Sequence, residues 1–208
     1  MNSCEPVLER YAIYDSYACR KGKGTTKALE RARAFSRKNG WYLKLDIRLY
    51  FDSIDQKILM HLLCNRFKDQ QLLALLDKIL ASYLTSPGKG LPIGNLVSQH
   101  LANFYLGHLD HWIKEDLQVR YYLRYMDDFI LFAHTRKELK MQLDSVCYFL
   151  DKQLKLQLKG NVQLNRCGYG IPFLGFRVYP HVIKLGAQSK KRFRETFQKY
   201  DRKYLAGK

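Results

Sequence analysis

Alternating apolar and polar positions along the chain predict strands as well as helices. Residues 41–46 alternate as a strand does, with Leu43 and Leu45 on one face. Aromatic and branched residues predict a strand hairpin over residues 120–133. Between and around these strands we expect helices, which cover residues 26–37, 53–66, 70–84, 97–117 and 136–153.

The segments between these elements carry turn and capping residues. Residues 1–18 read as an incomplete helical lead-in, and residues 86–92 form a loop rich in Gly and Pro. Ser53 or Asp52 is the expected cap of the helix that follows. Residues 155–184 predict short strands interrupted by glycines, and a basic helix closes the chain. Strands interleaved with helices on a sheet that contains antiparallel strands indicate an α+β sandwich.

Two adjacent carboxylates, Asp127 and Asp128, stand at the expected tip of the hairpin, between two apolar, aromatic-rich runs. Such neighbours repel each other strongly unless a positive group holds them. A bound divalent metal ion is one common solution, and an ordinary Asp-Asp turn on a surface hairpin is the alternative.

A third carboxylate, Asp46, stands at the C-terminal end of strand 41–46. It meets Asp127 and Asp128 only if the two strands are neighbours in one sheet. Carboxylates arranged in this way hold two magnesium ions about 4 Å apart in enzymes that transfer phosphoryl groups. The sequence therefore favours a two-metal site over a simple surface turn.

The charge of the chain fits a polyanionic partner. With 36 Lys plus Arg against 19 Asp plus Glu, the formal net charge is +17. The excess is concentrated in residues 19–40, with eight basic and one acidic residue, and in residues 184–208, with nine and two. Two solvated basic faces are the alternative interpretation of these patches.

Other features of the sequence concern the cellular compartment, the state of the cysteines and zinc binding. The chain has no apolar run of about 18 residues and no signal-peptide pattern, so we expect an internal protein without a membrane partner. The five cysteines are widely spaced without a Cys-x-x-Cys pair, which favours reduced thiols. His108 and His111 have the spacing of helical zinc ligands, but a third and a fourth ligand are missing nearby.

The segment from Gly90 to Gln99 combines two glycines, a proline and an amide-rich helix start. This composition suggests a backbone that approaches a ligand closely. It is not a P-loop, because no Gly-Lys-Ser/Thr follows. A simple helix-capping loop is the alternative.

Taken together, these segments resemble the palm of a reverse transcriptase. Residues 46–52 resemble its motif A, Gly90 to Gln99 its motif B, and residues 125–128 its motif C, in matching order. Residues 173–176 resemble the primer-grip hairpin that follows. The resemblance spans residues 12–185.

The resemblance implies an α+β polymerase palm, with a ferredoxin-like antiparallel sheet and helices on one face. Residues 1–40 would be partial fingers with a basic segment, residues 41–180 the palm, and residues 181–208 a basic segment that starts the thumb. Most of the fingers strands would precede this chain and most of the thumb would follow it. The chain is therefore expected to be either a fragment of a larger enzyme or a shortened protein.

The subfamily resemblance rests on two segments. Residues 14–25 and residues 93–99 are most similar to reverse transcriptases of diversity-generating retroelements, whereas those of group II introns and retrons typically have Pro where Gln99 stands. In that family the enzyme copies a template-repeat RNA into cDNA with frequent errors opposite adenines. The resemblance implies a cytoplasmic enzyme, encoded by a bacterium or a phage, and a small basic accessory protein as a partner.

The resemblance to reverse transcriptases implies catalytic roles for the residues at matching positions of this chain. Asp46 and Asp127 would be the principal metal ligands, with Asp128 beside them and the backbone carbonyl of Ile47 as a further ligand. Two Mg²⁺ ions, or Mn²⁺ in their place, would lower the pKa of the primer 3′-hydroxyl and neutralise charge on the triphosphate. The implied partners are an RNA template, a DNA or RNA primer and dNTPs.

The binding roles also carry over. Phe51 matches the steric gate, whose ring would clash with a ribose 2′-hydroxyl. The residues expected to contact the nucleotide are Tyr50, Phe51, Gly94, Ser98, Gln99 and Lys159. Lys159 is a candidate proton donor to pyrophosphate, and an exposed lysine at a strand end is the alternative. The residues expected to contact nucleic acid are Arg20, Lys21, Lys23, Phe173, Leu174, Gly175, Lys190, Lys191 and Arg192.

The function expected from the resemblance is RNA-directed DNA polymerisation. A truncated, inactive relative that only binds nucleic acid is the alternative. A palm of the diguanylate cyclase type fits less well, since it explains neither the loop of residues 90–99 nor the hairpin of residues 173–176.

Overall fold

The computed structural model describes residues 4–82, 86–92, 94 and 96–205 of the chain. The helices are α1 (Glu5–Tyr11), α2 (Thr25–Ser36), α3 (Tyr50–Ser53), α4 (Gln56–Arg66), α5 (Gln70–Ala81), α6 (Leu96–Glu115), α7 (Arg136–Leu154) and α8 (Ala187–Leu205). The strands are β1 (Trp41–Asp46), β2 (Tyr122–Tyr125), β3 (Asp128–Ala133), β4 (Gln163–Arg166), β5 (Ile171–Phe173), β6 (Phe176–Val178) and β7 (Ile183–Leu185). The predicted α+β class is confirmed.

The central sheet has the strand order β2-β3-β1-β4, and every pair in it is antiparallel. The strand predicted at 41–46 lies beside the second strand of the predicted hairpin, which confirms that the two are neighbours. Their register places Asp46 opposite Asp128. The sheet therefore brings together carboxylates that are about eighty residues apart in the sequence.

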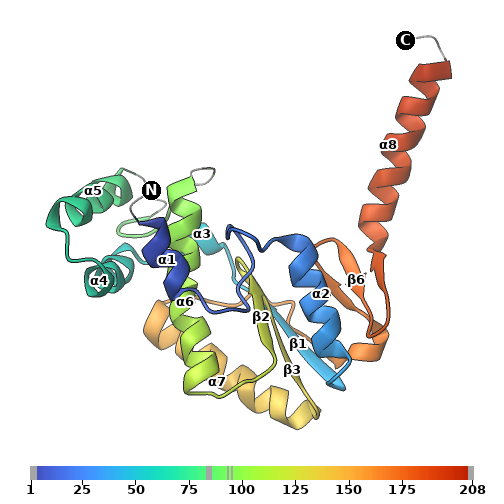
Figure 1. The fold of residues 1–208 in the computed structure, drawn as a ribbon, viewed down its shortest axis with the longest axis horizontal. Coiled ribbons are helices and arrows are strands. Elements are labelled where there is room, and N and C mark those ends of the chain that lie inside the picture. Colours follow the sequence, from blue (N-terminus) through green and yellow to red (C-terminus); the bar gives the residue numbers. More distant parts are fainter. Residues whose placement is uncertain (1–3, 83–85, 93, 95, 206–208) are drawn as a thin grey trace.

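Both faces of this sheet are covered (Figure 1). One face packs Leu43, Leu45 and Leu131 against α6 and α7. The other packs Tyr42 and Phe132 against α2 and the small sheet β5-β6-β7. The expectation that helices cover one face needs a correction, because α2 lies on the opposite face from α6 and α7.

The helix predicted over residues 53–66 is α4, which starts at Gln56 and ends at Arg66, and the short helix α3 precedes it. The capping side chain is Asp55, which accepts hydrogen bonds of 3.0 Å from the backbone N–H groups of Lys57 and Ile58. The predicted cap Ser53 instead donates its hydroxyl to the Arg48 carbonyl. The prediction was wrong by one turn, because Asp52, Ser53 and Asp55 are all residue types that favour a cap. The predicted end of the next helix, at residue 84, lies outside the described residues.

The basic helix predicted at the C-terminal end is α8, which projects from the body of the molecule (Figure 1). Its first turn is fixed to the turn between β5 and β6. The Gly175 carbonyl accepts hydrogen bonds from the Gly186 N–H, at 2.9 Å, and from the Ser189 hydroxyl, at 2.8 Å. Among the described residues, no helix is long and apolar enough to cross a bilayer.

Candidate active site

Three carboxylates gather at one end of the central sheet. Asp46 ends β1, Asp128 begins β3 opposite it, and Asp127 lies in the turn between β2 and β3. The Ile47 N–H donates to the Asp127 carbonyl over 3.4 Å, so the end of β1 is also tied to the turn. The sequence analysis made this meeting conditional on neighbouring strands, and the pairing of β1 with β3 meets that condition.

The electrostatics of the site show crowded negative charge. Burial raises the pKa of Asp127, and the nearby Asp46 carboxylate raises it further. Burial raises the pKa of Asp128 to about 6, although the Lys44 ammonium opposes this shift. The ionised forms of Asp127 and Asp128 are therefore less favourable here than in water, even with Lys44 beside Asp128.

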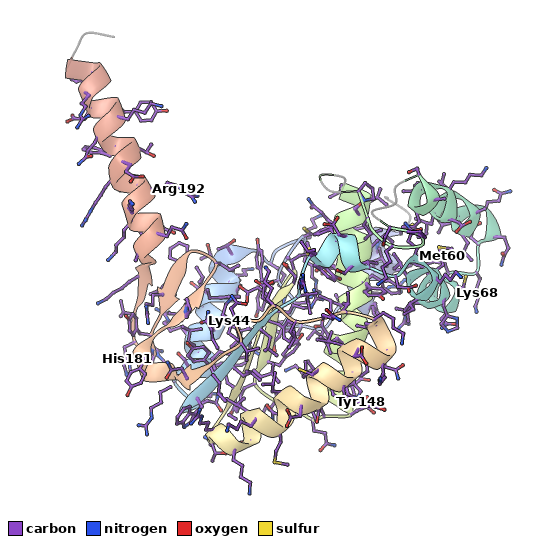
Figure 2. All side chains as sticks on the ribbon, turned by 180° about the vertical axis from the view of Figure 1, so that it is seen from behind. Lys44, Met60, Lys68, Tyr148, His181 and Arg192 are labelled. Carbon is purple, nitrogen blue, oxygen red and sulfur yellow. The ribbon has the colours of Figure 1, made fainter. Side chains whose placement is uncertain are left out.

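Two lysines supply positive charge. The Lys159 ammonium lies 2.9 and 2.8 Å from the two carboxylate oxygens of Asp46. Its backbone N–H also donates to the Asp46 carbonyl over 2.8 Å. Lys44, at the centre of the molecule in Figure 2, lies 2.9 Å from one oxygen of Asp128. Asp46 and Asp128 thus each have their own lysine.

Within the part of the chain that the structure describes, no three His, Cys, Asp or Glu side chains gather into a metal-binding group. Asp46 and Asp127 nevertheless fit a divalent cation, since they offer the hard oxygen ligands that Mg²⁺ prefers. Burial raises the pKa of Asp127 and the Asp46 carboxylate adds to this, while Lys159 opposes it, so a nearby divalent cation would favour the ionised form of Asp127. Asp128 faces Lys44 and is the weaker candidate. The predicted roles of Asp128 and of the Ile47 carbonyl as ligands remain predictions.

A buried arginine holds the turn that carries Asp127. Arg124, with 0% of its surface exposed, donates to both carboxylate oxygens of Asp110 on α6, at 2.8 and 2.6 Å. It also donates to the carbonyl of Met126 in the turn, at 2.8 Å, and to the side-chain oxygen of Asn103, at 3.0 Å. Met126 has a left-handed backbone, with φ of 55°. Arg124 therefore fixes the turn against α6.

Asp110 was missed in the sequence, and Arg124 was noticed only as a neighbour of the aspartates. One signal was available. Asp110 lies among Leu106, Leu109 and Ile113 on the apolar face of α6, where an unpaired acid is unfavourable. The Tyr122 hydroxyl also donates to Asp110, at 2.5 Å, so this carboxylate is fully engaged.

The loop of residues 90–99 is attached to the helix after β1. The Leu91 N–H donates to the Phe51 carbonyl and the Gly90 N–H to the Ile54 carbonyl, both over 2.9 Å. The Phe51 side chain is half-buried beside this loop. Tyr50 is fully buried, and its hydroxyl donates to the Ala102 carbonyl over 2.5 Å. The expectation that Tyr50 contacts a nucleotide is corrected, because its side chain belongs to the core.

The three other predicted residues of this segment differ in exposure and in hydrogen bonding. Gly94 is exposed and has a φ of 90°. Ser98 is buried, and among the described atoms its hydroxyl has no hydrogen-bond partner. The side-chain oxygen of Gln99 accepts a hydrogen bond from the Cys19 thiol over 3.1 Å. Ile93 and Asn95 lie outside the described residues.

The sequence model of the family described as "Reverse transcriptase (RNA-dependent DNA polymerase)" matches residues 3–177. The chain belongs to the reverse transcriptase family. The matched residues include the carboxylates, the loop of residues 90–99 and the turn described above.

Related proteins point to group II introns. The Lactococcus lactis group II intron-encoded protein LtrA is 31% identical over 115 residues, which are 52% of this chain and 18% of that protein. An uncharacterized 91 kDa protein in the cob intron of Schizosaccharomyces pombe is 37% identical over 120 residues, 52% of this chain and 15% of that protein. The matched region is thus less than a fifth of either relative.

Solved structures support the fold. A telomerase from Candida albicans, in complex with the TWJ fragment of telomeric RNA, matches with a TM-score of 0.67. It is 12% identical, and the match covers 88% of this chain and 38% of that one. The apo telomerase from Candida tropicalis gives a TM-score of 0.66 at 12% identity, over 88% of this chain and 39% of that one. At this identity the likeness concerns the fold alone.

In this member of the reverse transcriptase family the hairpin β5-β6 lies close to Asp128. Phe173 is buried, while Leu174 and Gly175 form the turn with φ of 50° and 82°. A groove of about 440 Å³ is lined by this turn, by the start of α8, and by Lys44 and Asp128. The position suits the predicted primer-grip role, which stays a prediction.

The basic residues predicted to contact nucleic acid differ in whether their side chains are already bonded within the protein. The Arg20 guanidinium is bonded to Glu9, at 2.7 Å, and to the carbonyls of Ile13 and Ser16. The prediction for Arg20 is corrected, since its donors hold the N-terminal segment together. Lys23 donates to the Tyr14 carbonyl over 2.8 Å.

The other predicted basic residues are exposed: Lys21 in the loop before α2, and Lys190, Lys191 and Arg192 on α8. Figure 2 shows Arg192 on the projecting part of that helix.

His111, the candidate partner of His108 in a zinc site, is hydrogen-bonded to Glu115 and to the Tyr11 carbonyl, at 2.6 and 2.7 Å. The structure gives no support to zinc binding there.

The Arg124 pair yields a stability prediction. Replacing Arg124 by Met leaves Asp110 buried without its cation, and we expect a loss of about 3–5 kcal/mol in the free energy of unfolding. Replacing both residues, as Arg124→Met with Asp110→Leu, should restore much of that loss because no buried charge remains. Urea-induced unfolding measures both changes.

The matched control is Lys191→Met, which removes one member of a surface pair whose charged atoms are 3.9 Å apart. It should change the free energy of unfolding by less than about 1 kcal/mol. An Arg124→Met variant as stable as this control would contradict the role assigned to the buried pair.

Proposed function

We propose that this chain is the catalytic palm of an RNA-directed DNA polymerase, which adds dNTPs to a primer 3′ end on an RNA template. The observation that carries the proposal is the register that sets Asp46 opposite Asp128, with Asp127 in the adjoining turn. Membership of the reverse transcriptase family supports the same reaction. The relatives are much longer proteins, so the activity of this chain is itself the proposal.

In the proposed reaction, the 3′-oxygen of the primer attacks the α-phosphorus of the dNTP. A new phosphorus–oxygen bond forms, the bond to pyrophosphate breaks, and the proton of the 3′-hydroxyl passes to solvent water. Asp46 and Asp127 would hold the divalent ions, and bound Mg²⁺ would supply Lewis acidity and charge neutralisation. Asp128 and Lys44 would keep the adjoining sheet edge close to neutral.

Lys159 is proposed to give a proton to the departing pyrophosphate. Its hydrogen bond to Asp46 raises the pKa of the ammonium, so the group is protonated at neutral pH. Its side chain is 45% exposed, which leaves it accessible from the solvent side of the site. A positioned, protonated donor near the reacting phosphate is what general acid catalysis requires.

The finer assignment is to a diversity-generating retroelement, with error-prone copying of RNA into cDNA in a bacterial or phage setting. Gln99 and the segment of residues 14–25 support this assignment by resemblance. A small basic accessory protein belongs to the same proposal. The second candidate function is an inactive module that only binds nucleic acid. It is favoured by the lysine contacts that already neutralise Asp46 and Asp128.

A primer-extension assay separates the two candidates. With an RNA template, a DNA primer, dNTPs and Mg²⁺, we expect extension by the wild-type chain. Asp127→Asn should reduce the rate more than about 100-fold, because it removes a charged ligand from the site. Asp77→Asn, on the exposed side of α5, is the control and should extend as the wild type does.

Template–primer binding is measured in parallel by fluorescence anisotropy. Binding without extension at protein excess would favour the inactive module and would overturn the polymerase proposal for this chain. Equal extension by wild type and Asp127→Asn would exclude the proposed site.

The half-buried ring of Phe51 predicts selection against ribonucleotides. Phe51→Val opens space where a ribose 2′-hydroxyl would clash, so the preference for dCTP over CTP should fall roughly tenfold or more. The ratio of kcat/KM for the two nucleotides is the measurement. Phe51→Tyr keeps the ring and should retain the preference. An unchanged ratio in Phe51→Val would show that Phe51 is not the residue that excludes ribonucleotides.

A further inference from the structure

We propose that Cys19 is a specificity-determining positioning residue, which fixes the orientation of the Gln99 side-chain amide toward the nascent base pair. The inference rests on the proposed function, because it concerns how the polymerase site selects its nucleotide. Nothing in the sequence pattern joins these residues, which are 80 positions apart.

The contact between them is direct. The Cys19 thiol donates to the Gln99 side-chain oxygen, with sulfur and oxygen 3.1 Å apart. The backbone of Cys19 is left-handed, with φ of 50°, a conformation that a residue with a Cβ seldom adopts without a reason. Among the described residues, this is the one hydrogen bond of the Gln99 side chain, so both hydrogens of its amide nitrogen stay available.

The thiol is held at a fixed place relative to the catalytic turn. The Ala18 carbonyl accepts a hydrogen bond of 2.7 Å from Asn103, one turn after Gln99 on α6. The side-chain oxygen of Asn103 in turn accepts from Arg124, which also holds the Met126 carbonyl. On the other side, the Tyr17 N–H donates to the Arg124 carbonyl over 3.0 Å. The same contacts that fix the turn of Asp127 therefore fix Cys19.

Gln99 lies in the first turn of α6, at the end of the loop that is bonded to Phe51 and Ile54. Under the proposed function, Gln99 is one of the residues expected to contact the nucleotide. A free primary amide can present either its oxygen or its nitrogen to a base after a rotation of about 180°. With its oxygen held by the thiol, the amide directs its two N–H donors away from Cys19. We infer that this fixed donor face limits which base pairs are accepted.

The kinetic test compares Cys19→Ala with Cys19→Ser. The measured quantity is the ratio of kcat/KM for matched and mismatched dNTPs opposite each template base. Cys19→Ala lets the amide rotate and should lower this ratio about three- to tenfold, the range expected for one net hydrogen bond. Cys19→Ser keeps a donor and should retain most of the ratio. Cys64→Ala, an exposed cysteine on α4, is the control and should change nothing.

The coupling between the two residues is tested in the Gln99→Ala background. If Cys19 acts through Gln99, adding Cys19→Ala to Gln99→Ala should have no further effect on the ratio. An unchanged ratio in Cys19→Ala alone, or an equal shift in both backgrounds, would overturn the inference.

A second readout does not depend on polymerase activity. Donation to Gln99 stabilises the neutral thiol, so Gln99→Ala should speed alkylation of Cys19 by iodoacetamide at least about threefold, relative to Cys64 in the same molecule. Mass spectrometry of the peptides gives both rates. If the wild-type chain extends no primer, the proposed function fails. The relative alkylation rate of Cys19 then still tests whether Cys19 contacts Gln99. An unchanged relative rate then overturns the inference as well.

Discussion

The buried ion pair between Arg124 and Asp110 is the interaction on which the site depends. Both side chains are removed from water, with 0% exposure, so neither tolerates the loss of the other. The pair joins β2 to α6, and the remaining Arg124 donors reach the Met126 carbonyl and Asn103. A single guanidinium thereby connects a strand, a helix and the turn that carries Asp127.

Negative charge is concentrated at the end of the sheet, beside the turn that Arg124 holds through the Met126 carbonyl. Asp127 and Asp128 have raised pKa values because burial disfavours their ionised forms, and Asp46 and Asp128 each engage a lysine. A fold that holds carboxylates in this state depends on rigid backbone contacts, since the carboxylates repel one another. The surplus of positive charge elsewhere on the chain suits the polyanionic substrates of the family.

Local patterns in the sequence predicted the strands, because a period of two fixes which residues share a face. The meeting of Asp46 with Asp128 depended in addition on which strands pair, and the structure supplies that pairing. They did not predict Asp55 as the cap, because Asp52 and Ser53 are equally suitable residue types. The second layer over the sheet was also missed, since a pattern of apolar residues does not say which face a helix such as α2 will cover.

The corrections at the site have the same physical origin. Tyr50 and Arg20 lie in or beside recognised motifs, yet their polar groups are used by carbonyls of the fold. The contact of Cys19 with Gln99 joins residues 80 positions apart, which no local pattern can reveal, whereas Asp110 left one signal as an acid on the apolar face of α6. The catalytic roles of the carboxylates remain predictions that family membership supports.

The central claim is that Asp46 and Asp127, held in place through Arg124, form a site for divalent cations. Titration of Mn²⁺ into the chain with bound template–primer, followed by electron paramagnetic resonance, tests it most directly. We expect binding to the wild type, a loss of at least about tenfold in affinity in Arg124→Lys, and a larger loss in Asp127→Asn. Equal Mn²⁺ affinity in the wild type and Asp127→Asn would contradict the account.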